Sequence, residues 1–223
     1  MMLPRMPAAV IFDMDGLIFD TETLYQDAFK AAGSQGGHDL PRAVVERTIG
    51  VPWAQSRLLI LEHMGPDFPV DQYFALMIDH FDLLAATQLR LKPGVLELLD
   101  CLDQFEIPRC IATSSAHSTV QSHLGAHGLS DRFQGVIGHG DYVAGKPSPD
   151  PFLMVAQHLG VEPALCLALE DSHNGVRSAA AAGMITFMVP DLLGPTPEME
   201  SLCSGIAKDL HAVRKLIEAA SCL

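Results

Sequence analysis

Short apolar runs alternate with amphipathic stretches through most of this chain. Five runs are too short for helices and predict buried strands, at 8–14, 108–113, 133–138, 165–169 and 185–189. Helical spacing of apolar residues covers the segments between them, at 95–102, 116–127, 149–159 and 175–182. Such alternation predicts an α/β fold, in which helices cover both faces of a parallel sheet. We expect 185–189 to be the last strand and 206–220 to form a closing helix.

One block of the chain carries helical patterning alone. Its first helix is expected to begin at Thr21, which can act as an N-cap, and to end before a glycine-rich loop at 34–41. Further helices are expected at 41–48, 53–64 and 70–89. No strand pattern interrupts the block. We therefore expect an all-helical domain at 18–88, inserted into a core domain built from 1–17 and 89–223.

Polar side chains follow four of the predicted strands. They are Asp13 and Asp15 after the first, Thr113 with Ser114 and Ser115 after the second, Lys146 after the third, and Glu170 with Asp171 after the fourth. The carboxyl ends of parallel strands meet at one edge of a sheet, where ligands bind in such folds. Hard carboxylate oxygens suit Mg²⁺, while an ammonium group and oriented N–H groups suit phosphate oxygens. The set therefore predicts a site for a phosphate group and a divalent cation.

Each of these residues has a simpler explanation when it is taken singly. Asp13 and Asp15 could belong to an Asp-Gly turn, and Thr113 could cap a helix. Lys146 could be a solvated loop lysine, and Glu170 with Asp171 an acidic turn. Four such coincidences at one edge of a sheet are less expected than a single site, so the common site is the better hypothesis.

Four motifs resemble the signatures of the haloacid-dehalogenase-like phosphatases. They are DMDG, the strand-end Thr113, GKPSPDPF around Lys146, and LEDSHNG. Their order and spacing over about residues 8–190 are similar to the beta-phosphoglucomutase-like subgroup, which carries a helical cap after the first motif. DMDGLIFDTETLY and EDSHNGVRSAAAAGM particularly resemble sugar-phosphate and pseudouridine 5'-phosphatases. The resemblance implies a three-layer Rossmann-like core, a helical cap and a phosphatase activity with Mg²⁺ as cofactor.

The resemblance also implies a role for each motif residue. Asp13 would be the nucleophile, forming an aspartyl-phosphate, and Asp15 would be the general acid and base. The metal ligands would be Asp13, the backbone carbonyl of Asp15, and Asp171, with Glu170 acting directly or through water. The phosphoryl oxygens would be held by Thr113, Ser114 N–H and Lys146, with Gly16 of the first motif beside them.

The cap is expected to read the leaving group, with Leu17, Thr21, Tyr25 and the loop Gly50-Val51-Pro52-Trp53 as lining candidates. Trp53 could equally pack between cap helices. Three family positions differ from the mutases: a basic residue is replaced by Trp53, a cap histidine by Tyr25 and an asparagine by His117. A mutase must grip a second phosphate, so these differences favour hydrolysis. A phosphosugar mutase is the alternative.

Other classes of protein fit less well. A phospho-acceptor receiver domain lacks the paired acids of the first motif and the long helical insertion, and a dehalogenase needs no metal.

Two further expectations concern single residues. His173, next to the fourth motif, is a further candidate for contact with the site. A core stripe of the cap is expected to consist of Tyr73, Phe74, Met77 and Phe81. The motifs do not identify the substrate beyond a small phosphorylated metabolite.

Composition limits the partners and the setting of the protein. The 223 residues include 27 acidic and 14 basic side chains, a formal net charge of −13. This charge argues against a nucleic-acid or anionic-membrane surface, which needs a basic face. Five cysteines without a CxxC pair indicate free thiols in a reducing compartment. With no signal-like or membrane-length apolar run, we expect a cytoplasmic, monomeric protein.

Overall fold

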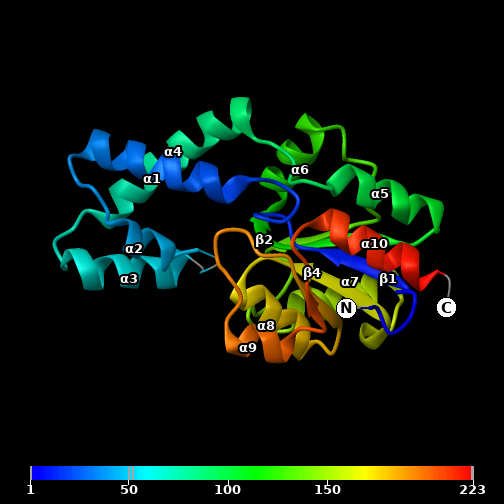
Figure 1. The fold of residues 1–223 in the computed structure, drawn as a ribbon. Helices are drawn as coiled ribbons and strands as arrows, with labels where there is room; N and C mark the ends of the chain where they lie inside the picture. Colours follow the sequence, from blue (N-terminus) through cyan, green and yellow to red (C-terminus); the bar gives the residue numbers. More distant parts are fainter. Residues whose placement is uncertain (1, 50, 52, 222–223) are drawn as a thin grey trace. The chain divides into compact units, whose positions relative to one another are not determined.

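The structure, a computed structural model, describes residues 2–49, 51 and 53–221. It forms two compact units (Figure 1). The core unit consists of Met1–Phe19 and Leu91–Leu223, and the helical unit consists of Asp20–Arg90. The expectations for Gly50, Pro52 and Cys222 lie outside the described residues.

The core unit contains one parallel sheet of six strands. These are β1 (Ala9–Phe12), β2 (Arg109–Ala116), β3 (Val136–His139), β4 (Cys166–Glu170), β5 (Ile185–Met188) and β6 (Gly205–Ile206). They lie in the order β3-β2-β1-β4-β5-β6, and every neighbouring pair is parallel. The predicted α/β class and parallel sheet are confirmed. Because β1 is flanked by β2 and β4, the residues after these three strands emerge side by side.

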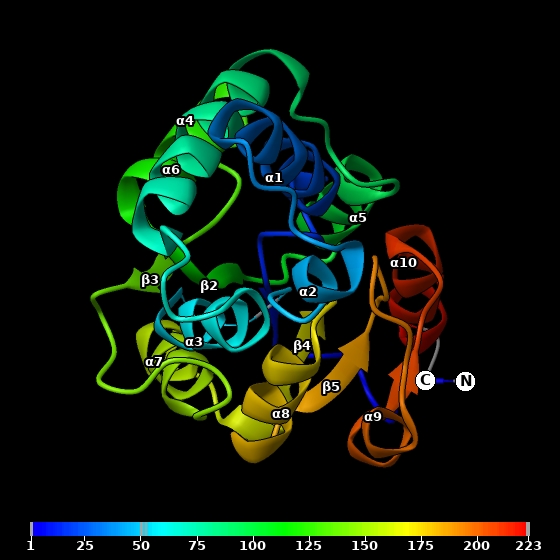
Figure 2. The same cartoon turned by 90° about the vertical axis from the view of Figure 1, so that its left-hand side faces the viewer.

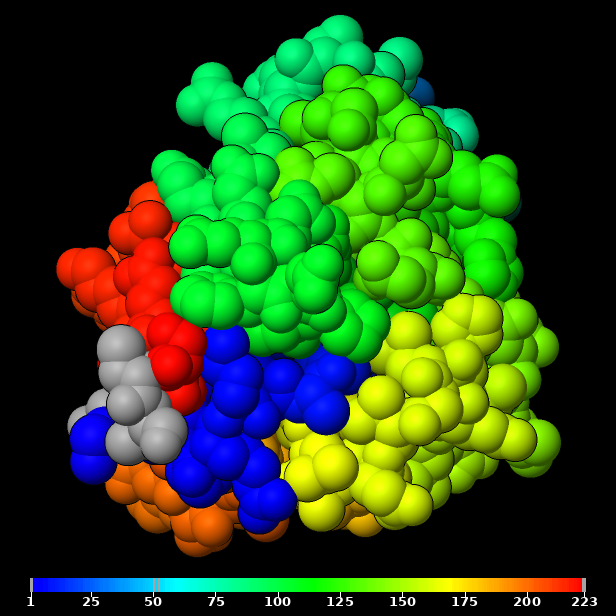
Figure 3. Space-filling model, turned by 90° about the vertical axis from the view of Figure 1, so that its right-hand side faces the viewer, coloured from blue at the N-terminus to red at the C-terminus, as the bar shows by residue number. Residues whose placement is uncertain are grey.

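Helices cover both faces of this sheet (Figures 1 and 2). They are α5 (Val95–Gln104), α6 (His117–Ala126), α7 (Asp150–Leu159), α8 (His173–Ala181), α9 (Pro197–Leu202) and α10 (Leu210–Ala220), with a 3₁₀ turn at Pro163–Leu165. One face carries α7 and α8, and the other carries α5 and α10. Figure 3 shows α5 and α10 side by side, although about a hundred residues separate them. This arrangement is the expected three-layer core.

The core on the α7 and α8 face follows from strand alternation. Ala9 and Ile11 of β1 are fully buried there, together with Cys110 and Ala112 of β2. Successive strand residues point to opposite faces, so Val10 and Phe12 face the other helical layer, and they are fully buried too. Burial on both faces explains why this strand reads as a continuous apolar run rather than as an alternating one.

The helical unit contains α1 (Thr21–Gly36), α2 (Arg42–Glu46), α3 (Trp53–Met64) and α4 (Val70–Gln88). Its own core includes Tyr73, Met77 and Phe81 of α4, all buried, with Phe74 packed at the margin. The expected core stripe is therefore present. The spacing of these residues, three or four apart, places them on one face of the helix, and that face packs against α1.

The structure corrects several expectations about secondary structure. The N-cap of α1 is Asp20, with Thr21 as the first helical residue, and the helix continues to Gly36 instead of giving way to a loop at 34. The last strand is β6, paired with β5, rather than 185–189, and the closing helix consequently begins at Leu210 instead of residue 206. A two-residue edge strand is too short for any periodicity, and only its long-range pairing defines it. The short helix α9 was also missed; its N-cap Thr196 accepts a hydrogen bond from Met199 N–H.

Tyr73 provides a pH-dependent test of the helical unit. Its hydroxyl donates a 2.6 Å hydrogen bond to Phe29 O, and burial raises the pKa of Tyr73 from 10.0 to about 12. Below pH 10 we expect Tyr73→Phe to be less stable than the wild type by about 1 kcal/mol, the contribution of one hydrogen bond. The unfolded tyrosine ionises first, so the wild-type advantage should disappear between pH 10 and about 12.

The measurement is the free energy of unfolding in urea for the two proteins across this pH range. The phenylalanine ring of the variant cannot ionise, so the difference between the proteins isolates Tyr73 from every other titrating group. A difference that stays constant from neutral pH to pH 12 would contradict the assignment.

Candidate active site

The two acids of the first motif lie in a tight turn after β1. The strand ends at Phe12, one residue before Asp13, and not at residue 14 as the apolar run suggested. Met14 O accepts hydrogen bonds from Ile18 N–H and Phe19 N–H, and Gly16 closes the turn with a φ of 79°. That backbone conformation favours glycine. The turn, rather than strand alternation, therefore sets the directions of the two carboxylates.

Lys146 connects three neighbouring strands at this edge of the sheet. Its Nζ lies 2.5 Å from Asp13 Oδ1, 2.5 Å from Glu170 Oε1 and 2.9 Å from Ala112 O. The side chain is 6% exposed, and its ammonium group lies 5.2 Å from the centre of the Phe152 ring. These contacts exclude the simple explanation of a solvated loop lysine. Asp13 after β1, Ala112 within β2 and Glu170 at the end of β4 thus converge on one cation.

Burial and charge together shift the pKa values of this cluster. Burial raises the pKa of Asp13 to about 6 and that of Glu170 to about 7, although Lys146 acts in the opposite direction on both. Burial would lower the pKa of Lys146, but Asp13 and Glu170 raise it above its usual range. Lys146 is therefore protonated and positively charged, and this charge compensates the negative charges of Asp13 and Glu170 only in part.

The carboxylates form a group that suits a divalent cation. Asp13, Glu170 and Asp171 are all buried, and each places one oxygen within 4.8 Å of the others. Within the described residues no other trio of His, Cys, Asp or Glu comes this close together. Three carboxylates against one ammonium group leave an excess of negative charge, and hard oxygen donors are the ligands that Mg²⁺ prefers. The donor set therefore fits Mg²⁺.

Asp15 is held by the end of β2. Its Oδ2 accepts a 2.7 Å hydrogen bond from Ser115 Oγ and a longer one, 3.5 Å, from Thr113 Oγ1. Thr113 is 1% exposed, and its Oγ1 also accepts a hydrogen bond from Ser115 N–H at 3.0 Å. The predicted residues Asp13, Asp15 and Thr113 thus lie at the same edge as Lys146.

Tyr142 and Ser115 contact this cluster, and sequence reasoning assigned no role to either. The Tyr142 hydroxyl donates a hydrogen bond to Thr113 O at 3.2 Å, and burial is the main cause of its raised pKa. Ser114, predicted to act through its N–H, is exposed beside them. The sequence signal that could have identified Ser115 is its position in the Thr113-Ser114-Ser115 run at the end of a predicted strand. Tyr142 lies in an irregular loop, where the sequence has no comparable pattern.

The start of α8 positions Glu170. Ser172 caps this helix by accepting a hydrogen bond from Gly175 N–H, and its hydroxyl donates a 3.2 Å hydrogen bond to Glu170 Oε2. Gly175 leaves the space that the Glu170 carboxylate occupies, since a Cβ atom at this position would overlap that carboxylate. The glycine in LEDSHNG therefore has a packing reason, because it allows a buried carboxylate beside the helix start.

Gly175→Ala should consequently disturb both folding and the cluster. We expect a loss of about 1–3 kcal/mol in the free energy of unfolding, typical of overpacking in a dense interior, because Glu170 must move from Lys146. Urea denaturation measures this loss. Gly194→Ala is the matched control, since no atom lies within 4 Å of a Cβ there. Equal stability of the two variants would contradict the placement of Glu170.

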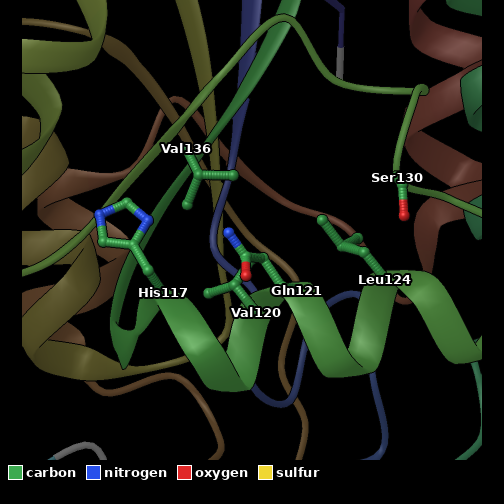
Figure 4. Close-up of a pocket in the computed structure, with 6 residues that line it drawn as sticks. All are labelled: His117, Val120, Gln121, Leu124, Ser130 and Val136. Carbon is green, nitrogen blue, oxygen red and sulfur yellow. The ribbon is translucent and has the colours of Figure 1, made fainter.

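The two histidine candidates have other partners. His117 Nε2 lies 2.8 Å from Asp141 Oδ2, and Gly138 N–H donates to the same oxygen and is the main cause of the lowered pKa of Asp141. His117 also lines an open pocket of about 300 Å³ between α6 and the start of β3 (Figure 4). His173 Nε2 lies 2.9 Å from Gly194 O. Neither contact involves the carboxylate cluster.

The predicted residues Thr21 and Trp53 belong to the helical unit. Thr21 is fully buried in the first turn of α1. Trp53 begins α3, and its ring stacks on Phe74 with centroids 3.5 Å apart. Tyr25 stacks on Phe81 in the same way, at 4.0 Å. Both aromatic rings therefore contribute to packing within this unit.

Comparisons with known proteins show the family to which this chain belongs. The haloacid dehalogenase-like hydrolase family matches residues 7–183. This range includes Asp13, Lys146, Glu170 and Asp171. The chain belongs to this hydrolase family and is an enzyme.

Several relatives and solved structures are similar over most of the chain. CbbY of Cupriavidus necator is 34% identical over 82% of this chain and 78% of that protein. The phosphorylated carbohydrates phosphatase of Thermotoga maritima is 30% identical over 79% of this chain and 82% of that protein. The crystal structure of CbbY from Rhodobacter sphaeroides in complex with phosphate has a TM-score of 0.77 at 23% identity, covering 92% of this chain and 95% of that one. This last similarity confirms the fold.

In the part of the chain that the structure describes, no helix combines the length and apolar character that crossing a bilayer requires.

Proposed function

We propose that this enzyme is a Mg²⁺-dependent phosphomonoesterase that hydrolyses a small phosphorylated metabolite through an aspartyl-phosphate. The observation that carries the proposal is the convergence of Lys146 with the buried carboxylates of Asp13, Glu170 and Asp171. A carboxylate nucleophile attacking a phosphate dianion needs positive charge around it. Lys146 supplies one positive charge in this cluster, and the three carboxylates could bind a divalent cation as a second source. The similarity to a phosphatase of the same family supports the assignment.

In the first half-reaction, an Asp13 carboxylate oxygen attacks phosphorus on the side opposite the leaving oxygen. The bond from phosphorus to that oxygen breaks, and protonated Asp15 donates its proton to the departing alcohol. Lys146 and Thr113, with the N–H of Ser114, would hold the phosphoryl oxygens, and Gly16 would shape the turn beside them. The products of this step are the free alcohol, phosphorylated Asp13 and ionised Asp15.

In the second half-reaction, Asp15 takes a proton from a water molecule as the water oxygen attacks phosphorus. The bond between phosphorus and Asp13 breaks, which releases inorganic phosphate and restores both side chains. The same carboxyl group thus serves as acid and then as base. Asp15 Oδ2 accepts hydrogen bonds from Ser115 and Thr113 at the end of β2. These hydrogen bonds support the proposed role, because they hold the Asp15 carboxyl group at the edge of the sheet where Asp13 also lies.

Mg²⁺, when bound, would offset the repulsion between the phosphate and the carboxylates. The residues that would hold it are Asp13, Asp171, the backbone carbonyl of Asp15, and Glu170 directly or through water. The raised pKa values of Asp13 and Glu170 support this metal site. They indicate that the protein compensates the negative charge of the two carboxylates only in part, so a bound cation would stabilise them further. Glu170 also orients Lys146, whatever its contact with the metal.

We further propose that the substrate is a sugar phosphate or a similar metabolite, and that residues 18–88 act as a cap that selects the leaving group. The name of the Thermotoga maritima relative supports the carbohydrate class. Trp53, which is only partly buried, is the cap residue proposed to contact the substrate; Thr21 was the other candidate, but its side chain is fully buried. The helical unit has its own hydrophobic core, and this supports the proposal that it acts as a cap domain distinct from the core unit.

We propose that the enzyme acts as a monomer in the cytoplasm. The cysteines Cys101, Cys110, Cys166 and Cys203, which lie within the described residues, carry free thiols. Free thiols are typical of reducing compartments. The acidic net charge of −13 supports a small-molecule substrate over a nucleic acid.

The test is the release of inorganic phosphate from a panel of sugar phosphates, nucleotides and phosphoglycolate, each assayed with Mg²⁺ and with EDTA. We expect release from at least one compound with Mg²⁺, loss of release with EDTA, and recovery when Mg²⁺ is restored. No release from any compound would overturn the proposal. Conversion of a hexose 1-phosphate to the 6-phosphate, without release, would replace the phosphatase by a mutase.

A further inference from the structure

Ser115 makes a short contact to Asp15, although it has no part in the two half-reactions. The Ser115 hydroxyl lies 2.7 Å from Asp15 Oδ2, across 100 residues of sequence, while Thr113 Oγ1 lies 3.5 Å from the same oxygen. A distance of 2.7 Å is typical of a good O–H···O hydrogen bond, and 3.5 Å is at the limit. Ser115 is therefore the main contact of the two.

The backbone around Ser115 makes this contact well defined. The pairing of β2 with β3 shifts register between Ala112 and Ala116, the stretch that contains Ser115. Such irregularities re-aim side chains and are frequent beside active sites. The Ser115 N–H donates to Thr113 Oγ1, which holds Ser115 against the buried end of the strand. The hydroxyl is thus presented to Asp15 by a hydrogen-bonded backbone.

The two hydroxyls of this strand end have separate uses. Thr113, which follows the Ala112 carbonyl bound by Lys146, would hold a phosphoryl oxygen, and its hydroxyl already accepts the Ser115 N–H. The Ser115 hydroxyl is directed to Asp15 instead. One strand end can therefore fix the phosphate and the proton-transfer group relative to each other, a relation on which proton transfer to the leaving oxygen depends.

We propose that Ser115 is the positioning residue of the general acid and base, holding the Asp15 carboxyl group in line with the leaving oxygen through its hydroxyl. The inference rests on the proposed phosphatase function. Ser115 takes no part in bond making: Asp15 still donates the proton to the leaving alcohol and later removes one from water. Loss of the hydroxyl leaves Asp15 present but less well oriented.

The consequence is a defect that depends on the leaving group. A good leaving group such as 4-nitrophenolate departs with little need of a proton, whereas the more basic phenolate needs one. A residue that positions the acid should therefore matter more as the leaving group becomes more basic. A residue that only supports the fold should affect every ester equally.

The experiment compares kcat/KM of the full-length protein with Mg²⁺ for a series of esters from 4-nitrophenyl phosphate to phenyl phosphate. The variants are Ser115→Ala, Ser115→Thr, which keeps a hydroxyl, and Ser118→Ala as the matched control on the exposed first turn of α6. For Ser115→Ala we expect a change below about twofold with 4-nitrophenyl phosphate and a loss of about tenfold with phenyl phosphate, part of the roughly 10²–10⁴-fold effect of positioned proton transfer. Ser115→Thr should recover most of the loss, and Ser118→Ala should behave as wild type.

A second readout from the same variants concerns the water step. If Asp15 is misplaced as a base, Ser115→Ala should show a burst of 4-nitrophenolate before a slower steady state, because the phosphorylated enzyme accumulates. An equal loss on every ester, without a burst, would overturn the proposal while leaving the phosphatase function intact. Absence of phosphate release by the wild type from all esters would instead remove the phosphatase function, and this inference with it.

Discussion

Replacing Asp13 by asparagine is expected to reduce phosphate release by at least about 10³-fold, as removal of a catalytic nucleophile does in other enzymes. The amide has the size of the carboxylate but cannot attack phosphorus. Burial raises the pKa of Asp13 to about 6, so the charged form is already disfavoured in the folded protein. A neutral asparagine should therefore be tolerated, and the variant should fold with stability close to that of the wild type.

The measurements are the rate of phosphate release and the free energy of unfolding of Asp13→Asn. Asp131→Asn is the matched control, because Asp131 is an exposed aspartate of the same core unit. Isothermal titration with inorganic phosphate in the presence of Mg²⁺ tests whether the rest of the site persists. Activity above a few per cent of wild type would be incompatible with Asp13 as the nucleophile.

Replacing Lys146 by alanine should have the second large effect, on stability as well as on activity. The side chain is 6% exposed and contacts two carboxylates, so its loss leaves both uncompensated in the interior. Breaking a buried ion pair in this way costs about 3–5 kcal/mol. Phosphate release should fall by about 10²-fold or more, because a fixed positive charge at the phosphoryl group is lost.

The stability loss of Lys146→Ala should depend on pH with a definite sign. Lys146 lowers the pKa values of Asp13 and Glu170, so its removal raises both further above the unfolded values of 3.8 and 4.5. Groups with raised pKa values destabilise the folded state as the pH rises, because the unfolded chain loses its protons first. The deficit should therefore be small below pH 4 and grow through neutral pH.

Urea denaturation in EDTA across this pH range measures the deficit. Lys208→Ala, which removes an exposed lysine paired with Asp209 at 3.6 Å, is the control and should change stability little. Asp13→Asn in the same chain should reduce the cost of Lys146→Ala, because one of the two carboxylates is then absent. A Lys146→Ala protein with the stability and activity of the control variant would exclude the ion-pair cluster.

The closeness of Asp13, Lys146 and the pair Glu170-Asp171 could be predicted because each follows a strand of a parallel sheet. Parallel strands bring their carboxyl ends to one edge, so position along the chain was enough to place these residues together. The direct contacts of Lys146 with Asp13 and Glu170 could not be read from the same pattern. They join residues 133 and 24 positions apart, and no local periodicity reports such distances.

Ser115 and Gly175 illustrate the residues that the pattern left without a role. Ser115 was visible at the end of a strand, but its hydrogen bond to Asp15 depends on a register shift in β2. Gly175 was visible in the fourth motif, but its importance lies in the volume that the Glu170 carboxylate occupies. Both depend on how side chains fill space between elements, which a one-dimensional pattern does not contain.

By itself, the sequence determined the α/β class, the helical block and the acids and lysine at the strand ends. These follow from periods of 2 and 3.6 residues and from residue types, which are local properties of the chain. Only the tertiary structure decided that β6 completes the sheet, that Lys146 bridges two buried carboxylates and that Ser115 holds Asp15. The physical reason is that hydrogen bonds and ion pairs between distant residues exist only after the core has packed.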